Sequence, residues 1–235
     1  MFTGTVTHRL RRIAFTTGAV AATLAAPAIG GLASAAPAEA ASANMYASVS
    51  LSGTLVAGNG VTGVTHIGTG QYEVTFSSNV SNCAYVATTI NAYSQALQIF
   101  TAGGHLSTDG VYVETKNQGG GLSSGIPFHL AVICPTAANV RTAVVGASGI
   151  ISRGSALTSS FSPGTGLYTV ATNQAVTSCA TVATRGSVNT AVPFDPATVE
   201  VVPGPASNTI GFQVRSLLFF GGNLENESFH SAIVC

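Results

Sequence analysis

The stretch GTGQYEVTFSSNVSNCAYVAT at residues 68–88 is written a second time, without a gap, as GTGLYTVATNQAVTSCATVAT at residues 164–184. A second block aligns 111–134 with 212–235, at an offset five residues larger. Insertions of this kind are tolerated in loops. The chain is therefore predicted to contain two tandem copies of one unit, repeat 1 over 45–134 and repeat 2 over 142–235, joined by a linker over 135–141.

Each copy shows the two-residue periodicity of half-buried β-strands. QYEVTF at 71–76 alternates large apolar residues with Glu73 and Thr75, and PFHLAVIC at 127–134 alternates in the same way. Further strands are predicted near 46–56, 61–67, 83–90, 96–101 and 110–117, and no stretch has the stripe of an amphipathic helix. Seven short strands per copy predict an all-β fold of two tandem immunoglobulin-like, antiparallel β-sandwich repeats.

Four cysteines occupy equivalent positions in the two copies. We pair Cys83 with Cys134 and Cys179 with Cys235, so that each copy ties its middle to its own last strand. Disulfides are typical of exported proteins with small cores. Closing about 50 residues in this way would stabilise each repeat by about 4 kcal/mol in the chain-entropy model.

The first forty residues have the features of a signal peptide. Arginines within residues 9–12 precede an uncharged, alanine-rich run, and Ala38-Glu39-Ala40 fits a small-residue cleavage site, so residues 1–40 are predicted to be removed. The alternative, an N-terminal membrane anchor, is less favoured because the run contains Pro27. No later apolar run is long enough to span a bilayer. The protein is expected to be secreted and extracellular, with association to the cell surface as an option.

Removal of this leader leaves five basic and seven acidic side chains, a net charge of about −2. Without a basic patch, nucleic acid is not expected as a partner. The partner classes that remain are an unknown protein, a cell-surface glycan or further copies of this chain. The predicted function is that of a non-enzymatic binding or structural module that acts at the cell exterior through surface contacts.

The patterns G-x-Y-x-V-x-F, V-x-x-C-A-Y-V-A-T and F-H-L-A-V-x-C resemble a short repeat of exported, largely uncharacterised proteins of actinobacteria. The resemblance covers essentially the whole mature chain, although repeat 2 has Thr181 in place of Tyr85. It implies a disulfide-bonded β-sandwich repeat and implies no chemistry.

One motif suggests an enzyme. GLSSG at 121–125 matches G-x-S-x-G, and Asp195 and His230 follow Ser123 in the order of a hydrolase triad. That motif functions on a strained turn between a strand and a helix, whereas here it follows a run of glycines and precedes a predicted strand. The alternative function is a secreted hydrolase of the esterase or glycosidase type that uses Ser123 or groups around His129 and His230.

His129 and His230 are equivalent in the two copies, and the alternation places both imidazoles on the outward face, half-exposed. Cys-x-x-Cys and His-x-His spacings are missing from the sequence, so neither a metal nor another cofactor is expected.

One segment differs sharply between the copies. Where repeat 1 has Lys-Asn-Gln-Gly at 116–119, repeat 2 has four large apolar residues, Leu217, Leu218, Phe219 and Phe220. This segment is a candidate interface, either between the two repeats or between two chains.

Overall fold

The regular structure of the described residues consists of β-strands alone. The computed structural model describes residues 44–90, 97–117, 119–136, 139–191, 197–216 and 222–235. Sixteen strands and no helix occur within these ranges. The predicted signal peptide, Asp195 and the apolar segment 217–220 lie outside the described residues.

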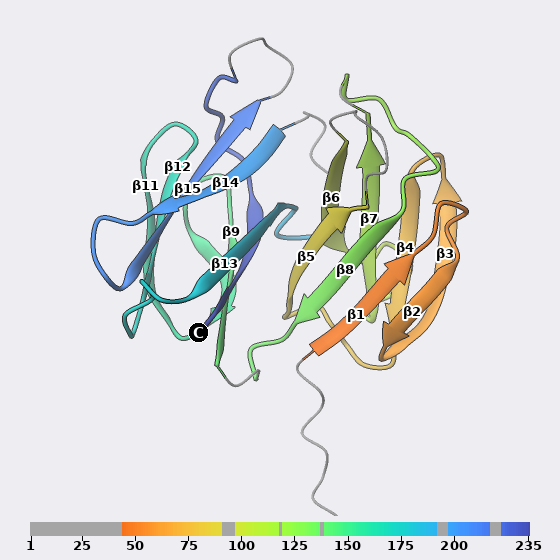
Figure 1. Cartoon of the computed structure of the whole chain (residues 1–235), viewed down its shortest axis with the longest axis horizontal. Coiled ribbons are helices and arrows are strands. Elements are labelled where there is room, and N and C mark those ends of the chain that lie inside the picture. The colour runs from red at the N-terminus through yellow and green to blue at the C-terminus, as the bar shows by residue number, and fades with distance from the viewer. Residues whose placement is uncertain (1–43, 91–96, 118, 137–138, 192–196, 217–221) are drawn as a thin grey trace, which may run out of the picture. The chain divides into compact units, whose positions relative to one another are not determined.

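Repeat 1 is built from eight strands in two four-stranded antiparallel sheets (Figure 1). One sheet has the order β2-β1-β8-β5 and the other has the order β3-β4-β7-β6. The strands are β1 (Asn44–Val49), β2 (Leu55–Asn59), β3 (Val61–Gly68), β4 (Gln71–Phe76), β5 (Ala84–Thr89), β6 (Gln98–Gly103), β7 (Gly110–Lys116) and β8 (Phe128–Ile133).

Repeat 2 has the same arrangement, with sheet orders β10-β9-β16-β13 and β11-β12-β15-β14. Its strands are β9 (Val140–Val145), β10 (Ile151–Ser155), β11 (Leu157–Gly164), β12 (Leu167–Thr172), β13 (Ala180–Arg185), β14 (Ala197–Pro203), β15 (Thr209–Ser216) and β16 (Phe229–Val234). Each strand of repeat 2 takes the place of the strand eight earlier, and every sheet contains strands from one repeat only. The predicted tandem of antiparallel β-sandwiches, each with one disulfide, is confirmed, and both repeats belong to one compact unit, Glu39–Cys235.

The core of each repeat lies between its two sheets. In repeat 1 the inward side chains of β4, Tyr72, Val74 and Phe76, meet those of β8, including Phe128 and Leu130. A second, separate cluster fills repeat 2. The predicted two-residue alternation of burial is clearest in β8, whereas β7 is buried on both faces and β2 is exposed throughout.

The eighth strand of each repeat arises where one strand was predicted over 46–56. The chain turns at residues 50–54, and β1 and β2 form an antiparallel pair. Gly53 has a φ of 77°, in the left-handed region that favours glycine, and a Cβ there would lie 2.7 Å from the Tyr72 ring. Gly149 holds the equivalent turn of repeat 2 with a φ of 82°.

Both disulfides join the cysteines that the sequence pairs, Cys83 with Cys134 and Cys179 with Cys235. Each links the segment before the fifth strand of its repeat to the end of the last strand. The two disulfide bonds are consistent with an oxidising compartment. In the part of the chain that the structure describes, we find no helix with the length and apolar character of a membrane span.

The predicted polar face of β4 is not exposed. Glu73 is fully buried, because the loop between β6 and β7 folds over it. Its carboxylate accepts the backbone N–H groups of His105 at 2.9 Å and Leu106 at 3.1 Å. Glycine at 110 is required beside it, since a Cβ there would lie 2.0 Å from a Glu73 oxygen. A buried carboxylate therefore fixes this loop.

Candidate functional site: a cleft beside the contact between the repeats

Strand β5 is the terminal strand of its sheet, so alternate backbone groups along its outer edge need partners from elsewhere. Side chains of repeat 2 supply them. The N–H of Tyr85 donates to Nδ1 of His230 at 2.9 Å, and the N–H of Ala87 donates to Oγ1 of Thr184 at 2.8 Å. The Thr184 hydroxyl in turn donates to the Ala87 carbonyl at 2.9 Å. A threonine and a histidine on one sheet face thus hold the edge of a strand.

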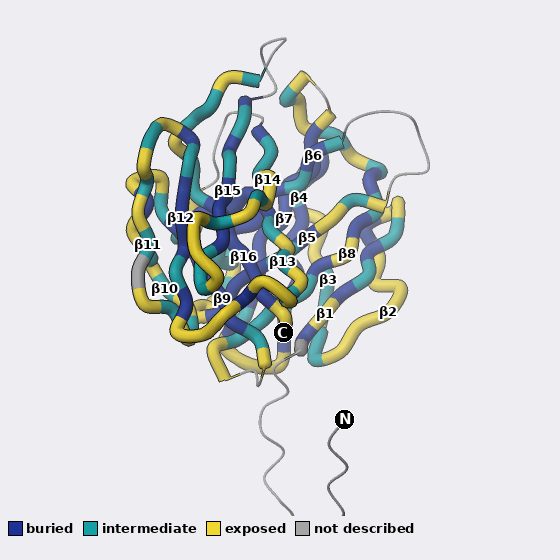
Figure 2. The backbone as a smooth tube through the Cα atoms, turned by 60° about the vertical axis from the view of Figure 1, so that its left-hand side comes forward, coloured by how far each residue is buried: buried dark blue, intermediate teal, exposed yellow. Residues whose placement is uncertain are grey.

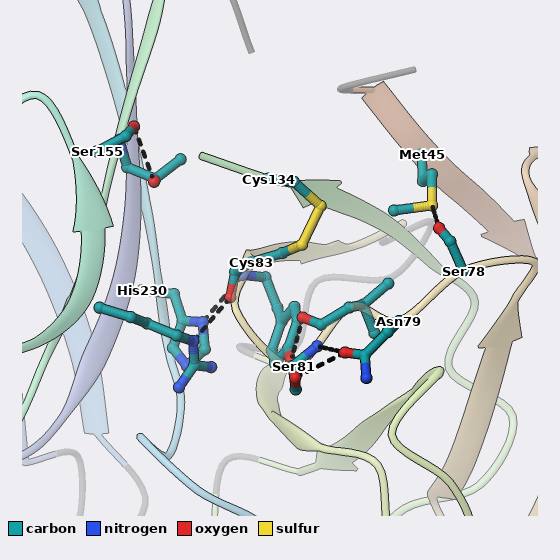
Figure 3. The surroundings of a disulfide bond; sticks show 12 residues. Met45, Ser78, Asn79, Ser81, Cys83, Cys134, Ser155 and His230 are labelled. Atoms are coloured by element: carbon teal, nitrogen blue, oxygen red, sulfur yellow. Dashed lines mark hydrogen bonds between the residues drawn. A yellow bond between two sulfur atoms is a disulfide. The ribbon is translucent and has the colours of Figure 1, made fainter. Parts of the chain in front are cut away.

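Thr184 and His230 can act together because they are direct neighbours across β13 and β16. Directly opposed residues of an antiparallel pair present their side chains on the same face. The outward faces of β13 and β16 therefore carry the two groups side by side, toward repeat 1. Figure 3 shows His230 beside the segment that carries the Cys83–Cys134 disulfide.

His230 is completely buried, which corrects the expectation of a half-exposed imidazole. Its strand, β16, is buried along most of its length (Figure 2). The imidazole faces away from the core of its own sandwich, but Tyr85 of repeat 1 packs against it. Its Nε2 contacts the Ser187 carbonyl at 2.8 Å, and its ring stacks on Tyr85 at 4.9 Å. Because Nδ1 accepts from Tyr85, Nε2 carries the proton that is donated to Ser187.

Burial, aided by the positive charge of Arg153, lowers the pKa of His230 to about 3. The hydrogen bond to Ser187 opposes this change but is the smallest influence. The imidazole is thus neutral at physiological pH, which is the form that can accept the Tyr85 N–H.

The second terminal strand on this side of repeat 1, β6, is covered by backbone of repeat 2. Thr101 and Gly186 form a parallel β-bridge, in which the N–H of Ser187 donates to the Thr101 carbonyl at 2.9 Å. Two residues further on, the N–H of Gly103 donates to the Asn189 carbonyl at 2.9 Å. A Cβ at 186 would lie 2.7 Å from the Thr101 carbonyl oxygen and 2.8 Å from His230, so this approach requires glycine.

Two arginines of repeat 2 complete the contact. Arg153 donates from Nε to the Cys83 carbonyl at 3.0 Å, and its guanidinium lies 5.3 Å from the centre of the Tyr85 ring. Arg185 lies over the Phe100 ring of β6 and forms an ion pair with Glu227 at 3.0 Å. The repeats are therefore held by a buried polar network.

An open cleft of about 560 Å³ lies beside this contact, between the outward face of the β2-β1-β8-β5 sheet and the strands β13 and β14. This volume falls within the range of about 300 to 1,000 Å³ that is usual for ligand sites. Several of its apolar side chains are unusually exposed, with Tyr46 at 48%, Val182 at 46% and Val201 at 40%. The lining residues are Tyr46, Ala47, Val86, Ala87, Thr88, His129, Leu130, Ala131, Thr181, Val182, Ala183, Val199 and Val201.

Among the described residues of this lining, His129 is the ionisable side chain, apart from the phenol of Tyr46. It is exposed, and it forms no hydrogen bond or ion pair with another described residue. Thr88, its direct neighbour across β5 and β8, is also exposed. The sequence prediction of an outward, accessible imidazole therefore describes His129 but not His230.

The structure does not bring Ser123 and His230 together as a nucleophile and base. Both ring nitrogens of His230 contact backbone groups, of Tyr85 and Ser187. Ser123 lies half-buried before β8, where its N–H donates to the Thr115 carbonyl at 3.0 Å, and no described helix follows it. The strand–turn–helix geometry of a nucleophile elbow is thus missing at this serine.

The contact and the cleft contain residues that the sequence analysis did not single out, notably Thr184, Gly186 and Arg153. One signal was available. The threonine belongs to the Val-Ala-Thr sequence that both repeats share, while the next three residues diverge from Thr-Ile-Asn at 89–91 to Arg-Gly-Ser at 185–187. A shared outward threonine followed by a divergent segment marks the point where the two sheet faces acquire different neighbours.

Comparison with known proteins finds no matching family model, no matching curated protein and no matching solved structure. Within the residues that the structure describes, no group of three or more His, Cys, Asp or Glu side chains is placed to hold a metal ion.

Proposed function

We propose that the protein is an exported, non-enzymatic binding module that acts at the cell exterior and uses the cleft between its two repeats as the binding site. The observation that carries this proposal is the combination of a ligand-sized volume with exposed apolar walls and a few polar groups, which include Thr88 and His129. Apolar pockets with a few convergent polar groups are the usual form of binding sites.

Two further features support the proposal. Hydrogen bonds to backbone groups engage the buried His230, which leaves His129 as the accessible member of the equivalent pair. The two disulfides suit an exterior location, where thiols are oxidised. The predicted partner classes are a protein and a cell-surface glycan.

The test compares retention of the mature protein, residues 41–235, on fractions of the cell exterior. Val201→Glu places a charge in the cleft at an exposed position of β14, and Val56→Glu places the same charge on β2, where the valine is 66% exposed. We expect Val201→Glu to abolish retention and Val56→Glu to leave it unchanged. Equal retention of both variants would show that the cleft is not the site.

A screen of esterase, peptidase and glycosidase substrates tests the non-enzymatic part of the proposal. We expect no turnover by the purified mature protein. Activity that disappears in Ser123→Ala or His129→Ala would favour the hydrolase instead.

A further inference from the structure

The molecule contains the same pair of groups twice, once occupied and once open. Thr184 and His230 are direct cross-strand neighbours and hold the edge of β5. Thr88 and His129 are direct cross-strand neighbours at the equivalent place in repeat 1, and both are exposed at the cleft. The occupied pair is therefore a template, within the same molecule, for what the open pair can bind.

We propose that Thr88 and His129 bind the edge of an extended, uncharged peptide segment of another protein, in the way that Thr184 and His230 bind β5. This inference rests on the proposed function and specifies its ligand. A backbone N–H of the ligand donates to the imidazole of His129, and the N–H and carbonyl two residues further along meet the Thr88 hydroxyl. Recognition of an extended segment through its backbone is an established mode of peptide binding.

The spacing of the two groups selects an extended polypeptide. In the template, the bound donors belong to Tyr85 and Ala87, which are two residues apart on one strand. Two residues of a strand span about 6.6 Å, and the donors at that interval point to the same edge. A threonine and a histidine on adjacent strands match this interval, because the template shows both bonds formed at once.

The walls of the cleft select for an uncharged segment. Among the described residues, no Asp, Glu, Lys or Arg lines it, and its sides are formed by Val86, Val182, Val199 and Val201. Tyr46 stands where the occupied face has Thr142, and so adds an aromatic surface for an apolar side chain of the ligand. β13 and β14, which border the cleft, are each the terminal strand of their sheet. Their edges can extend the backbone pairing.

The open pair, Thr88 and His129, is suited to a ligand that binds reversibly. The covalent link between the repeats presents β5 to Thr184 and His230 at high effective concentration. The contact between the repeats also includes the parallel bridge at Gly186, whereas repeat 1 has Ile90 at the equivalent position. A segment bound by Thr88 and His129 lacks both advantages and is expected to dissociate readily.

The probe is a synthetic peptide of residues 82–89 with Cys83→Ser, the strand that the occupied pair already holds. We expect saturable binding to the mature protein by fluorescence anisotropy, with NMR shifts of the His129 imidazole and none of the His230 imidazole. His129→Ala and Thr88→Val are each expected to weaken binding by about 3- to 10-fold, the value of one hydrogen bond. Thr65→Val, an exposed threonine on β3, is the matched control and should leave binding unchanged.

A peptide N-methylated at the position of Ala87 lacks the donor for the threonine hydroxyl and places a methyl group against it, so we expect this peptide to bind more weakly than the parent by more than the effect of Thr88→Val. If it binds as well as the parent peptide, backbone recognition is wrong. The apolar dye ANS is a second probe of the cleft. If the peptide fails to bind but ANS binds, and Val201→Glu abolishes the binding of ANS, the cleft is a site for another ligand class. In that case only the present inference fails. If neither binds, the proposed function fails with it. Concentration-dependent dimerisation that His129→Ala abolishes would replace the foreign peptide with a second copy of this chain.

Discussion

The outward sheet faces of the two repeats carry the same threonine and histidine in the same register, yet His230 is fully buried and His129 is exposed. The difference does not come from the residues themselves. It comes from the segment after the shared Val-Ala-Thr, where Gly186 allows the backbone of repeat 2 to reach β6 and Ile90 stands at the same place in repeat 1. The threonine–histidine pair of repeat 2 has a structural role because the edge of β5 packs against it. We expect the pair of repeat 1, which no described strand edge covers, to be available for binding.

Removal of the histidines should give the largest contrast between the repeats. His230→Ala leaves the Tyr85 N–H buried without an acceptor and opens a cavity, and we expect a loss of about 2 to 4 kcal/mol in the free energy of unfolding. His129→Ala removes an exposed side chain and should change the free energy by less than about 0.5 kcal/mol. Urea denaturation of both variants measures the difference. Similar losses would mean that the two faces are not distinguished by occupancy.

A side chain at position 186, which blocks the close contact between the backbones of the two repeats, should have the next largest effect. Gly186→Ala places a Cβ against the Thr101 carbonyl and His230, and we expect a loss of about 1 to 3 kcal/mol from overpacking. Gly63→Ala is the control, because a Cβ at that position has no atom within 4 Å. Hydrogen exchange should show faster exchange of the Tyr85 and Ala87 amides in Gly186→Ala alone. Unchanged protection of these two amides would contradict the close contact.

The threonines provide a smaller and more local contrast. Thr184→Val keeps the shape of the side chain but removes both hydrogen bonds to Ala87, so we expect a loss of about 1 to 2 kcal/mol. Thr88→Val changes an exposed residue of equal shape and should be nearly neutral. Thermal unfolding compares the two variants directly. Equal melting temperatures would show that the hydrogen bonds of Thr184 do not stabilise the contact between the repeats.

Acid should weaken the occupied pair gradually. An unfolded histidine binds its proton near pH 6.5, whereas burial and Arg153 keep the pKa of folded His230 at about 3. The unfolded state therefore binds one more proton between these values, and the free energy of unfolding should fall by about 1.4 kcal/mol for each pH unit between about pH 6 and pH 3. Tyr85 and Arg153 are the titratable groups that face the imidazole. The dependence of the free energy of unfolding on pH should be weaker in His230→Ala. If it is equally steep in this variant, the titration of carboxylates causes it instead of His230.

Local patterns were sufficient for the architecture. The alternation of Tyr72, Val74 and Phe76 and the position of one cysteine in each half of a repeat depend on neighbours within one sandwich, so the sequence predicts them. The turn around Gly53 was missed because serine and threonine continue an apparent strand through it.

The alternation could not predict what covers an outward face. Glu73 and His230 both lie on the polar side of their strands, but a loop buries the first and repeat 1 buries the second. Periodicity identifies the side of a strand that faces its own core and contains no information on contacts with other elements. The candidate interface at 217–220 lies outside the described residues, and the contact that the structure does describe is polar.

The hydrogen bond between the Tyr85 amide and His230 tests the central claim most directly. An N–H···N bond transmits a scalar coupling between its two nitrogens, which can be measured by NMR in uniformly ¹⁵N-labelled mature protein. We predict a resolved coupling between the Tyr85 amide nitrogen and Nδ1 of His230 at pH 7, with the proton of the imidazole on Nε2. An imidazole of His230 that is protonated on Nδ1, or that lacks this coupling while the Tyr85 amide is protected, would contradict the account.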